Sequence, residues 1–402
     1  MPRYNQFLSP FGDLEKYFIT ENWLIDQYVG SQLWVWGSGG QSSAFVRLGT
    51  NEFRIGTSTP VTTFAGGSNW VQTSVGSFGA VAAIKNDGTL WTWCEIARGD
   101  LTSGRVSTPV TTFAGGTDWK QVSCGSEMMG AIKTDGTLWM WGSNLSGVLG
   151  INDTTERTTP VTTFAGGNNW KQLTVGYRRV FAIKTDGSLW CWGNNDNSSL
   201  GVNQTTQSSI CTPVTTFAGG NDWKTVSAGS SQNSGRGCHT VAIKTDGTLW
   251  VWGLNTSAQL GINSGIQRCT PVTTFAGGTN WKIAQSRQDS TIAIKEDGTL
   301  WVWGNNAYGQ LGTNDTIRKS TPVTTFAGGN TWKQVAGGGG TSAAIKTDGT
   351  LWLWGFGGGG SGSNGILGMN DNSIHRSTPA TTFAGGTNWK YISIFSSAYA
   401  VQ

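Results

Sequence analysis

The sequence predicts an all-β protein that closes into a seven-bladed β-propeller. All but one of the 22 tryptophans fall on a repeating grid, a T-P-V/A-T-T-F phrase occurs seven times, and the two chain ends carry complementary parts of one unit. The phenylalanine of that phrase recurs at intervals of 49, 51, 53, 58, 51 and 57 residues, a length typical of propeller blades and longer than most helix-pair repeats. We therefore divide the chain into a unique leader, residues 1–29, and a propeller, residues 30–402.

Each unit predicts four short strands, as residues 332–383 illustrate. The segment W-K-Q-V-A-G opens with an alternation of apolar and polar residues. S-A-A-I-K-T follows and is itself followed by Asp348-Gly349, a strong hairpin signal. The return segment T-L-W-L-W-G is rich in residues that favour strands. After a variable loop comes T-P-A-T-T-F, whose proline predicts an edge strand or a first strand position because it cannot donate a ladder hydrogen bond.

The tryptophans predict how the units pack. Each unit has one tryptophan after F-A-G-G and two in L-W-x-W, and a lone four-stranded sheet cannot cover them on both faces. Stacking the units and closing the row into a ring covers both faces. We expect the tryptophans to form core and seams, with a blade-core signature at Trp91, Trp139, Trp190, Trp250, Trp301 and Trp352.

The chain ends predict ring closure. The first L-W-V-W-G, residues 33–37, lacks the two strands that should precede it, and residues 389–401 supply those two strands at the other end. Pairing them completes the seventh blade and removes unpaired edges that would promote aggregation.

Composition excludes several classes of function. Charged residues make up 12% of the chain with a net charge of +4, so no strong field is available to attract nucleic acid or an acidic membrane. Six lysines lie in I-K-x-D-G beside an aspartate, which predicts a solvated, locally neutral rim. The six cysteines form no C-x-x-C, the start lacks a secretory signal, and nothing approaches a membrane span. We expect a soluble protein made in cytoplasm.

One segment carries a family signature. Residues 303–312, W-G-N-N-A-Y-G-Q-L-G, resemble the repeat of the regulator of chromosome condensation family of seven-bladed propellers, and weaker versions follow Trp141, Trp192 and Trp252. The resemblance covers residues 30 to 402 and implies that fold. Three stretches depart from the pattern: residues 93–98, 283–287 and the glycine-rich loop 355–368.

The resemblance would also imply the founding activity of the family. That activity is nucleotide exchange on a small GTPase, combined with chromatin binding by a basic tail. The leader has only Arg3 and Lys16 as basic residues, and no protruding insertion of the kind carried by exchange-active members is present. We therefore expect no exchange activity.

The residue pattern predicts no enzyme, no metal and no cofactor. The two histidines, His239 and His375, lie in different units without a nucleophile and an acid beside them, and we expect His239 to be a hydrogen-bonding residue of a loop or strand edge. The Asn-Asp pairs at 152–153, 314–315 and 370–371 fit turns better than calcium ligands.

The leader is the first candidate for partner binding. Ser9-Pro10 is a plausible helix start, and an apolar stripe follows, although residues 17–20 fit a strand equally well. The leader either seals one face of its own ring or docks into a larger assembly. The docking residues would be Phe11, Leu14, Tyr17, Phe18, Trp23, Leu24 and Tyr28.

The loops between W-x-W and T-P are the second candidate. Residues 94–108, 193–212, 253–270 and 355–378 vary while the strands barely change, which indicates either partner binding on one face or unconstrained drift. Near-identical repeats, low charge and an apolar leader resemble propellers of bacteriophages and environmental bacteria. That resemblance implies a virion component, tail-associated and used for host attachment or decoration, held by residues 1–29. The alternative is a cellular, cytoplasmic scaffold or regulatory module.

Overall fold

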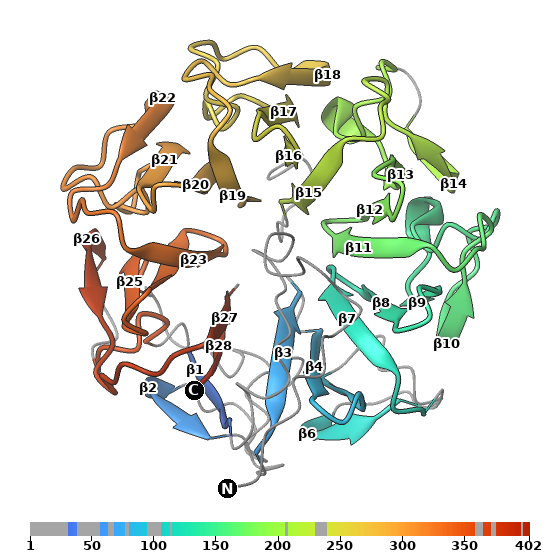
Figure 1. Cartoon of the computed structure of the whole chain (residues 1–402), viewed down its shortest axis with the longest axis horizontal. Helices are drawn as coiled ribbons and strands as arrows, with labels where there is room; N and C mark the ends of the chain where they lie inside the picture. The colour runs from blue at the N-terminus through green and yellow to red at the C-terminus, as the bar shows by residue number, and fades with distance from the viewer. Residues whose placement is uncertain are drawn as a thin grey trace, which may run out of the picture.

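The computed structural model describes residues 31–37, 57–62, 68–76, 80–94, 106–112, 115–205, 208–229, 239–357, 365–370, 375–394 and 397–402. These residues form seven four-stranded antiparallel sheets around a central axis (Figure 1). The predicted seven-bladed propeller is confirmed. The leader, with its seven predicted docking residues, lies outside the described residues.

Six blades are continuous in sequence. Within each of them, the four strands follow one another from the axis to the outside of the ring. Blade 1 holds β3 (Trp70–Val75), β4 (Val81–Lys85), β5 (Leu90–Cys94) and β6 (Val106–Thr111). Blade 2 holds β7 (Trp119–Cys124), β8 (Met128–Lys133), β9 (Leu138–Gly142) and β10 (Arg157–Thr162). Blade 3 holds β11 (Trp170–Val175), β12 (Arg179–Lys184), β13 (Leu189–Asn194) and β14 (Ser209–Thr215).

The second half of the ring repeats this order. Blade 4 holds β15 (Trp223–Ala228), β16 (His239–Lys244), β17 (Leu249–Gly253) and β18 (Arg268–Thr273). Blade 5 holds β19 (Trp281–Ser286), β20 (Ser290–Lys295), β21 (Leu300–Gly304) and β22 (Lys319–Thr324). Blade 6 holds β23 (Trp332–Gly337), β24 (Thr341–Lys346), β25 (Leu351–Gly355) and β26 (Arg376–Thr381). Two three-residue 3₁₀ turns, η3 (Leu145–Gly147) and η4 (Asp196–Ser198), lie in loops.

The closing blade is built from both ends of the chain. Its order is β2 (Thr57–Thr62), β1 (Leu33–Gly37), β28 (Ser397–Val401) and β27 (Tyr391–Ile394), so β1 pairs with β28 as predicted. Gln32 and Gln402 exchange both backbone hydrogen bonds at 3.1 Å. Trp36 Nε1 also donates to the carbonyl oxygen of Ile366 in blade 6, at 2.9 Å, and so joins residues 330 positions apart.

The Asp-Gly hairpin is fixed by a side-chain relay. Asp135 Oδ1 accepts hydrogen bonds from the Thr137 backbone N–H and hydroxyl at 2.9 and 2.7 Å, and Thr137 Oγ1 accepts from Trp139 Nε1 at 2.9 Å. Gly136 has φ +82°, and a Cβ there would collide with the carbonyl oxygen of Asn168. Glycine is therefore required by conformation and by space.

The outer strands explain the prolines. Each T-P-V/A-T phrase lies in β2, β6, β10, β14, β18, β22 or β26, which pairs with a neighbour on one side only. The predicted edge position is confirmed. Each of these strands also shows a register irregularity near its proline, for example between Arg157 and Val161, because the missing N–H interrupts the ladder.

Side chains of the inner strands join the first blades. Gln121 Nε2 donates to the carbonyl oxygen of Leu173 at 2.8 Å, and Gln121 Oε1 accepts from the Leu173 N–H at 3.0 Å. Gln72 and Gln172 make the same pair of contacts with the blade that follows theirs. A buried amide therefore continues the backbone hydrogen bonding across each of these seams.

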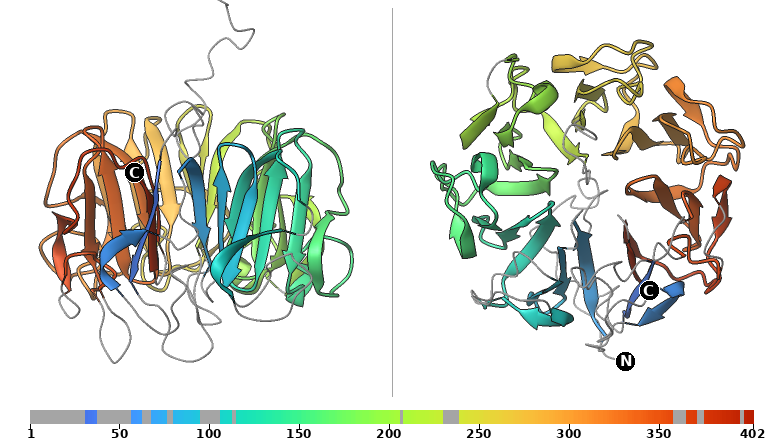
Figure 2. Two further views of the ribbon diagram at one scale, coloured as in Figure 1. Left: turned by 90° about the horizontal axis from the view of Figure 1, so that it is seen from below. Right: turned by 180° about the vertical axis from the view of Figure 1, so that it is seen from behind.

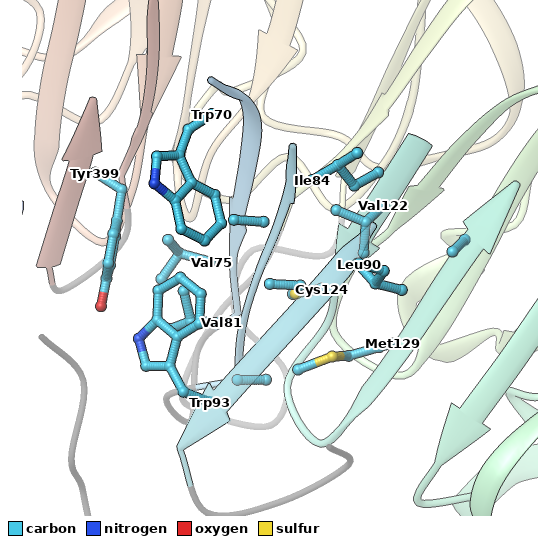
Figure 3. Close-up of a cluster of buried hydrophobic side chains, with 14 of the residues drawn as sticks. Trp70, Val75, Val81, Ile84, Leu90, Trp93, Val122, Cys124, Met129 and Tyr399 are labelled. Atoms are coloured by element: carbon cyan, nitrogen blue, oxygen red, sulfur yellow. The ribbon is translucent and has the colours of Figure 1, made fainter. Parts of the chain in front are cut away.

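The core consists of interleaved tryptophans and aliphatic side chains. Figure 3 shows one cluster at the junction of blade 1 and the closing blade, in which Tyr399 of β28 lies beside Trp70, Trp93, Val75 and Val81 of blade 1. In blade 3, Trp170 contacts Trp190 and Trp192 edge-on, with centroids 6.1 and 6.2 Å apart. This geometry suits aromatic quadrupoles and recurs around the ring.

Candidate functional site

The tryptophans of the predicted blade-core signature lie at the margin of the core. Trp91, Trp139, Trp190, Trp250, Trp301 and Trp352 are partly buried, whereas the other two tryptophans of each blade are enclosed. Each signature tryptophan donates its Nε1–H to the hairpin threonine or serine at 2.9 Å. These residues fix the hairpin to the blade and leave little surface for a ligand.

The six I-K-x-D-G lysines pack against these tryptophans. Lys295 Nζ lies 4.8 Å from the Trp281 ring centroid and 4.4 Å from that of Trp301, and Lys85, Lys133, Lys184, Lys244 and Lys346 repeat the arrangement. The Lys133 side chain is 17% exposed and 3.1 Å from Asp118. The expectation of a solvated rim was wrong for these lysines, because two indole faces stabilise each ammonium and cover its stem.

His239 begins β16 and is fully buried. Its Nε2 lies 2.9 Å from Thr291 Oγ1 in the next blade, so it is a hydrogen-bonding strand residue. Burial, followed by the charges of Arg179 and Arg287, lowers its pKa to about 3. A neutral imidazole enclosed in a seam is not placed to exchange protons with a bound substrate.

The hairpins and the F-A-G-G segments share one end of the sheets, which we name the hairpin face. The Trp170 N–H donates to the Gly136 carbonyl oxygen at 3.0 Å, so the segment that enters blade 3 rests on the hairpin of blade 2. Strands such as β9 start at this face and end at the opposite one, the loop face. Figure 2 shows the strands running between the two faces.

Phenylalanines protrude at the hairpin face. The F-A-G-G phenylalanine is 62–66% exposed in each of the five blades where it is described, namely at Phe164, Phe217, Phe275, Phe326 and Phe383. Its backbone is held, since the Phe164 N–H donates to the Gly150 carbonyl oxygen at 2.8 Å, but its ring has no comparable packing. In the sequence these phenylalanines mark the period of the repeat, and their identity in every unit does not by itself reveal their exposure.

At the loop face, the family-like signature, residues 303–312, holds the loop that follows β21 in place. Asn306 Nδ2 donates to the carbonyl oxygen of Asp315 at 2.9 Å, and Asn306 Oδ1 accepts from the Leu311 N–H at 2.9 Å. Leu311 is fully buried, and Trp354 of the next blade donates to the Gln310 carbonyl oxygen at 3.0 Å. The signature therefore builds a seam, and only the outer part of each loop is free to vary.

The Asn-Asp pairs at 152–153 and 314–315 form turns, as predicted, whereas Asp371 of the third pair lies outside the described residues. Asn152 and Asn314 have φ of +64° and +61°, and Asp153 pairs with Arg157 at 2.7 Å. Within the described ranges, no group of three or more His, Cys, Asp or Glu could hold a metal ion. In the same part of the chain, no helix is long and apolar enough to cross a membrane.

An aromatic cluster joins two loops on the loop face. The ring centroids of Tyr308 and Phe356 are 5.0 Å apart, and His375 stacks on Phe356 at 4.9 Å. Ile266 and Ile317 are 64% and 65% exposed on neighbouring loops. The second histidine thus belongs to a surface aromatic group, and no contact between described residues joins it to His239.

Comparisons with known proteins agree with this architecture. The family model described as "RCC1-like domain" matches residues 32–399. The Arabidopsis thaliana ultraviolet-B receptor UVR8 is 30% identical over 209 residues, which cover 51% of this chain and 46% of the receptor. The mouse probable E3 ubiquitin-protein ligase HERC4 is 28% identical over 214 residues, which cover 52% of this chain and 19% of the ligase. The chain thus spans less than half the length of these curated relatives.

Solved structures give the same fold. Prp20p from Saccharomyces cerevisiae has a TM-score of 0.75 at 18% identity, covering 93% of this chain and 92% of that one. Human WBSCR16 has a TM-score of 0.76 at 16% identity, covering 92% and 98%. Because the family model matches nearly the whole ring, the chain belongs to the family of RCC1-like domains.

Proposed function

We propose that this chain is a non-enzymatic, protein-binding propeller that engages its partner through the phenylalanines of the hairpin face. The observation that carries the proposal is the repeated, two-thirds exposed phenylalanine at one position of successive blades. Packing within the ring does not require an aromatic side chain there. Exposed apolar groups gathered on one face are typical of surfaces that bind other proteins.

Repetition around a ring gives this surface its strength. A single exposed phenylalanine contributes little, but several identical contacts made together raise avidity without any new kind of contact. A partner with several copies of one apolar site would use them simultaneously. Among the solved structures of this fold, Prp20p is described with its binding properties to Gsp1p and histones, and yeast RCC1 is described bound to Kap60, which supports a protein as the ligand.

The more specific proposal places the protein in a bacteriophage virion, made in the host cytoplasm, held by residues 1–29 and presenting the ring for attachment or decoration. Its support is the near-identity of the repeats, the low charge and the apolar leader. The alternative is a cellular, cytoplasmic scaffold of the same family.

Mass spectrometry of purified virions from the source of the sequence tests the location. We expect the wild-type chain in the particles, and a variant lacking residues 1–29 should fold but be absent from them.

Replacing Phe217, Phe275 and Phe326 together with serine should reduce binding to the partner at least about tenfold, because several contacts of a multivalent surface are lost.

Ile266→Ser and Ile317→Ser together form the matched control, because they remove similar apolar area from the loop face. The control should bind its partner like wild type. If particles lack the protein while one cellular protein is captured in a phenylalanine-dependent way, the virion proposal fails and the scaffold is supported. If the serine variant binds every partner as wild type does, the hairpin face is not the binding surface.

A further inference from the structure

Six blades place a lysine at the same position beside the axis, near the hairpin face. The inner strands of the seven sheets surround the axis in Figure 1, and the tryptophan that follows F-A-G-G leads into each of them. In every blade except blade 1, the residue directly after this tryptophan is a lysine. We name these residues the axial lysines: Lys120, Lys171, Lys224, Lys282, Lys333 and Lys390. Their side chains are all partly or fully exposed to solvent.

Contacts of two axial lysines place their ammonium groups among the hairpins. Lys224 Nζ lies 3.7 Å from Glu296 Oε1, which belongs to the hairpin of the next blade. Lys390 Nζ donates to Ser31 Oγ at 2.7 Å, and the Ser31 carbonyl oxygen accepts from the N–H of Trp70 in the next inner strand. These two ammonium groups therefore lie at the inner rim of the hairpin face, where one blade meets the next. The repeat gives the other four lysines the same position on their strands.

The positive charges of neighbouring blades act on one another. Partial burial lowers the pKa of Lys171 from its ordinary value, and the positive charges of Lys120 and Lys224, in the blades on either side, lower it further. The ammonium groups of three successive blades are thus close enough to repel one another. Such repulsion destabilises a folded chain, and a bound negative charge would offset it.

The described acidic residues offset only part of this charge. None of the seven described inner strands contains Asp or Glu. Asp118 precedes the tryptophan of blade 2, but it lies 3.1 Å from Lys133, which is a hairpin lysine. Asp222 lies in the same way 3.2 Å from Lys244. Glu296 stands where the other five continuous blades have Asn or Thr. In the described part of the chain, the inner rim therefore carries more positive than negative charge.

The fold itself does not require a lysine at this position. Blade 1 has Val71 there, 5% exposed, and its inner strand pairs in the same register as that of blade 2. The charge in the other six blades therefore indicates a use beyond strand formation. Positive charges arranged around one axis favour a compact anion, because a single central molecule can approach all of them.

We propose that the axial lysines bind a compact polyphosphate anion on the axis at the hairpin face. Lysine ammonium groups donate charge-assisted hydrogen bonds to phosphate oxygens, and several phosphate groups on one small molecule let lysines of different blades bind it together. The anion offsets the repulsion between blades and stabilises the ring. The exposed phenylalanines follow the outer strands, so this site does not depend on them.

Inositol hexakisphosphate is the probe, titrated into the full chain in a calorimeter. We expect saturable binding of one molecule per chain, a rise in Tm that follows the same saturation, and weaker binding as sodium chloride is added. Lys171→Gln, Lys282→Gln and Lys333→Gln together should weaken binding at least about tenfold, because three charged donors are lost. Arginine at the same three positions should retain binding, since the charge remains.

Arg268→Gln, Arg318→Gln and Arg376→Gln together form the matched control. They remove the same net charge near the starts of three outer strands, at the loop face, and should bind the probe like wild type. The variant with Phe217, Phe275 and Phe326 replaced by serine should also bind the probe like wild type, which separates this test from that of the proposed function.

If the glutamine variant does not fold, valine at the same three positions copies the residue of blade 1 and takes its place. Absence of saturable binding to wild type would overturn the proposal. Equal weakening by the lysine variant and the arginine control would also overturn it, because only net charge would then matter. Lysine-dependent binding of a polyglutamate peptide, without binding of the probe, would show that the ring takes an acidic segment of a protein instead.

Discussion

Several residues in this ring have structural roles that their residue type alone does not reveal. Lysines of I-K-x-D-G are sandwiched by indoles, asparagines of the signature hold loops together, and a histidine is an uncharged seam residue. The lysines contact tryptophans of their own blade, Asn306 holds its own loop, and His239 contacts Thr291 of the next blade. Residue type predicted polarity correctly, but the partner decided the role.

His239 predicts a dependence of stability on pH. Its pKa is about 3 in the folded protein and has an ordinary value of 6.5. Between these values the unfolded chain binds a proton that the folded chain does not, so stability rises with pH across the window and is lost as pH falls below about 6.5. From pH 6.5 to 5, this residue should lower the free energy of unfolding by about 2 kcal/mol.

Urea unfolding of wild type and His239→Asn at several pH values measures this effect. The variant should show a flatter profile above pH 5, whatever its absolute stability. His375→Asn, a change at an exposed ring, should keep the wild-type slope. An identical slope for wild type and His239→Asn would contradict the assignment of the neutral form.

At the scale of the blade, the repeats are equivalent except where one position differs. The closing blade has the Trp34 and Trp389 pair, with centroids 6.1 Å apart, but Gln402 takes the place of the lysine. The Gln402 amide donates to Asn388 Oδ1 at 2.8 Å. Among the described residues of this blade, no lysine takes the place that in the other six blades lies 4.3 to 5.5 Å from two indole centroids.

Gln402→Lys should stabilise the ring. The introduced ammonium would lie over two tryptophan faces, and a gain of about 1 kcal/mol in the free energy of unfolding is expected from exposed cation–π contacts. Gln402→Met is the control for length and hydrophobicity without charge and should give no such gain. Denaturant unfolding decides between them, and equal stability of the two variants would show that the indoles exert no cation preference there.

At the scale of the whole molecule, stability depends on closure. β27 and β28 come from the end of the chain, and β28 pairs with β1, which in turn pairs with β2. Without them, blades 1 and 6 would each expose a tryptophan-rich face, and β1 would lose one of its two neighbours.

Removing residues 391–402 should therefore abolish the cooperative fold. We expect aggregation or an expanded chain by size-exclusion chromatography and loss of near-ultraviolet circular dichroism. A circular permutant that joins residues 402 and 32 through a Thr-Asp-Gly turn and opens at Gly265 retains all strands and should fold. A truncated chain that melts like wild type would contradict closure as the source of stability.

Most of the fold could be predicted from the amino-acid sequence alone. The periodicity of the sequence predicts the number of blades, the hairpins, the edge position of the prolines and the closing blade. It does so because strand alternation and turn chemistry are local properties that repeat. The departure at residues 283–287 was also visible, but its meaning depends on Gly337 of another blade, where a Cβ would collide with Cδ of Arg287.

The sequence by itself determined the strands, their order and the closure of the ring, since each of these is set by local pattern and by complementary chain ends. Only the tertiary structure decided which tryptophans are enclosed, that Arg287 fills the space left by Gly337, and that the repeated phenylalanine stays exposed. Those properties depend on which side chains of different blades meet, and burial is set by neighbours that no local pattern specifies.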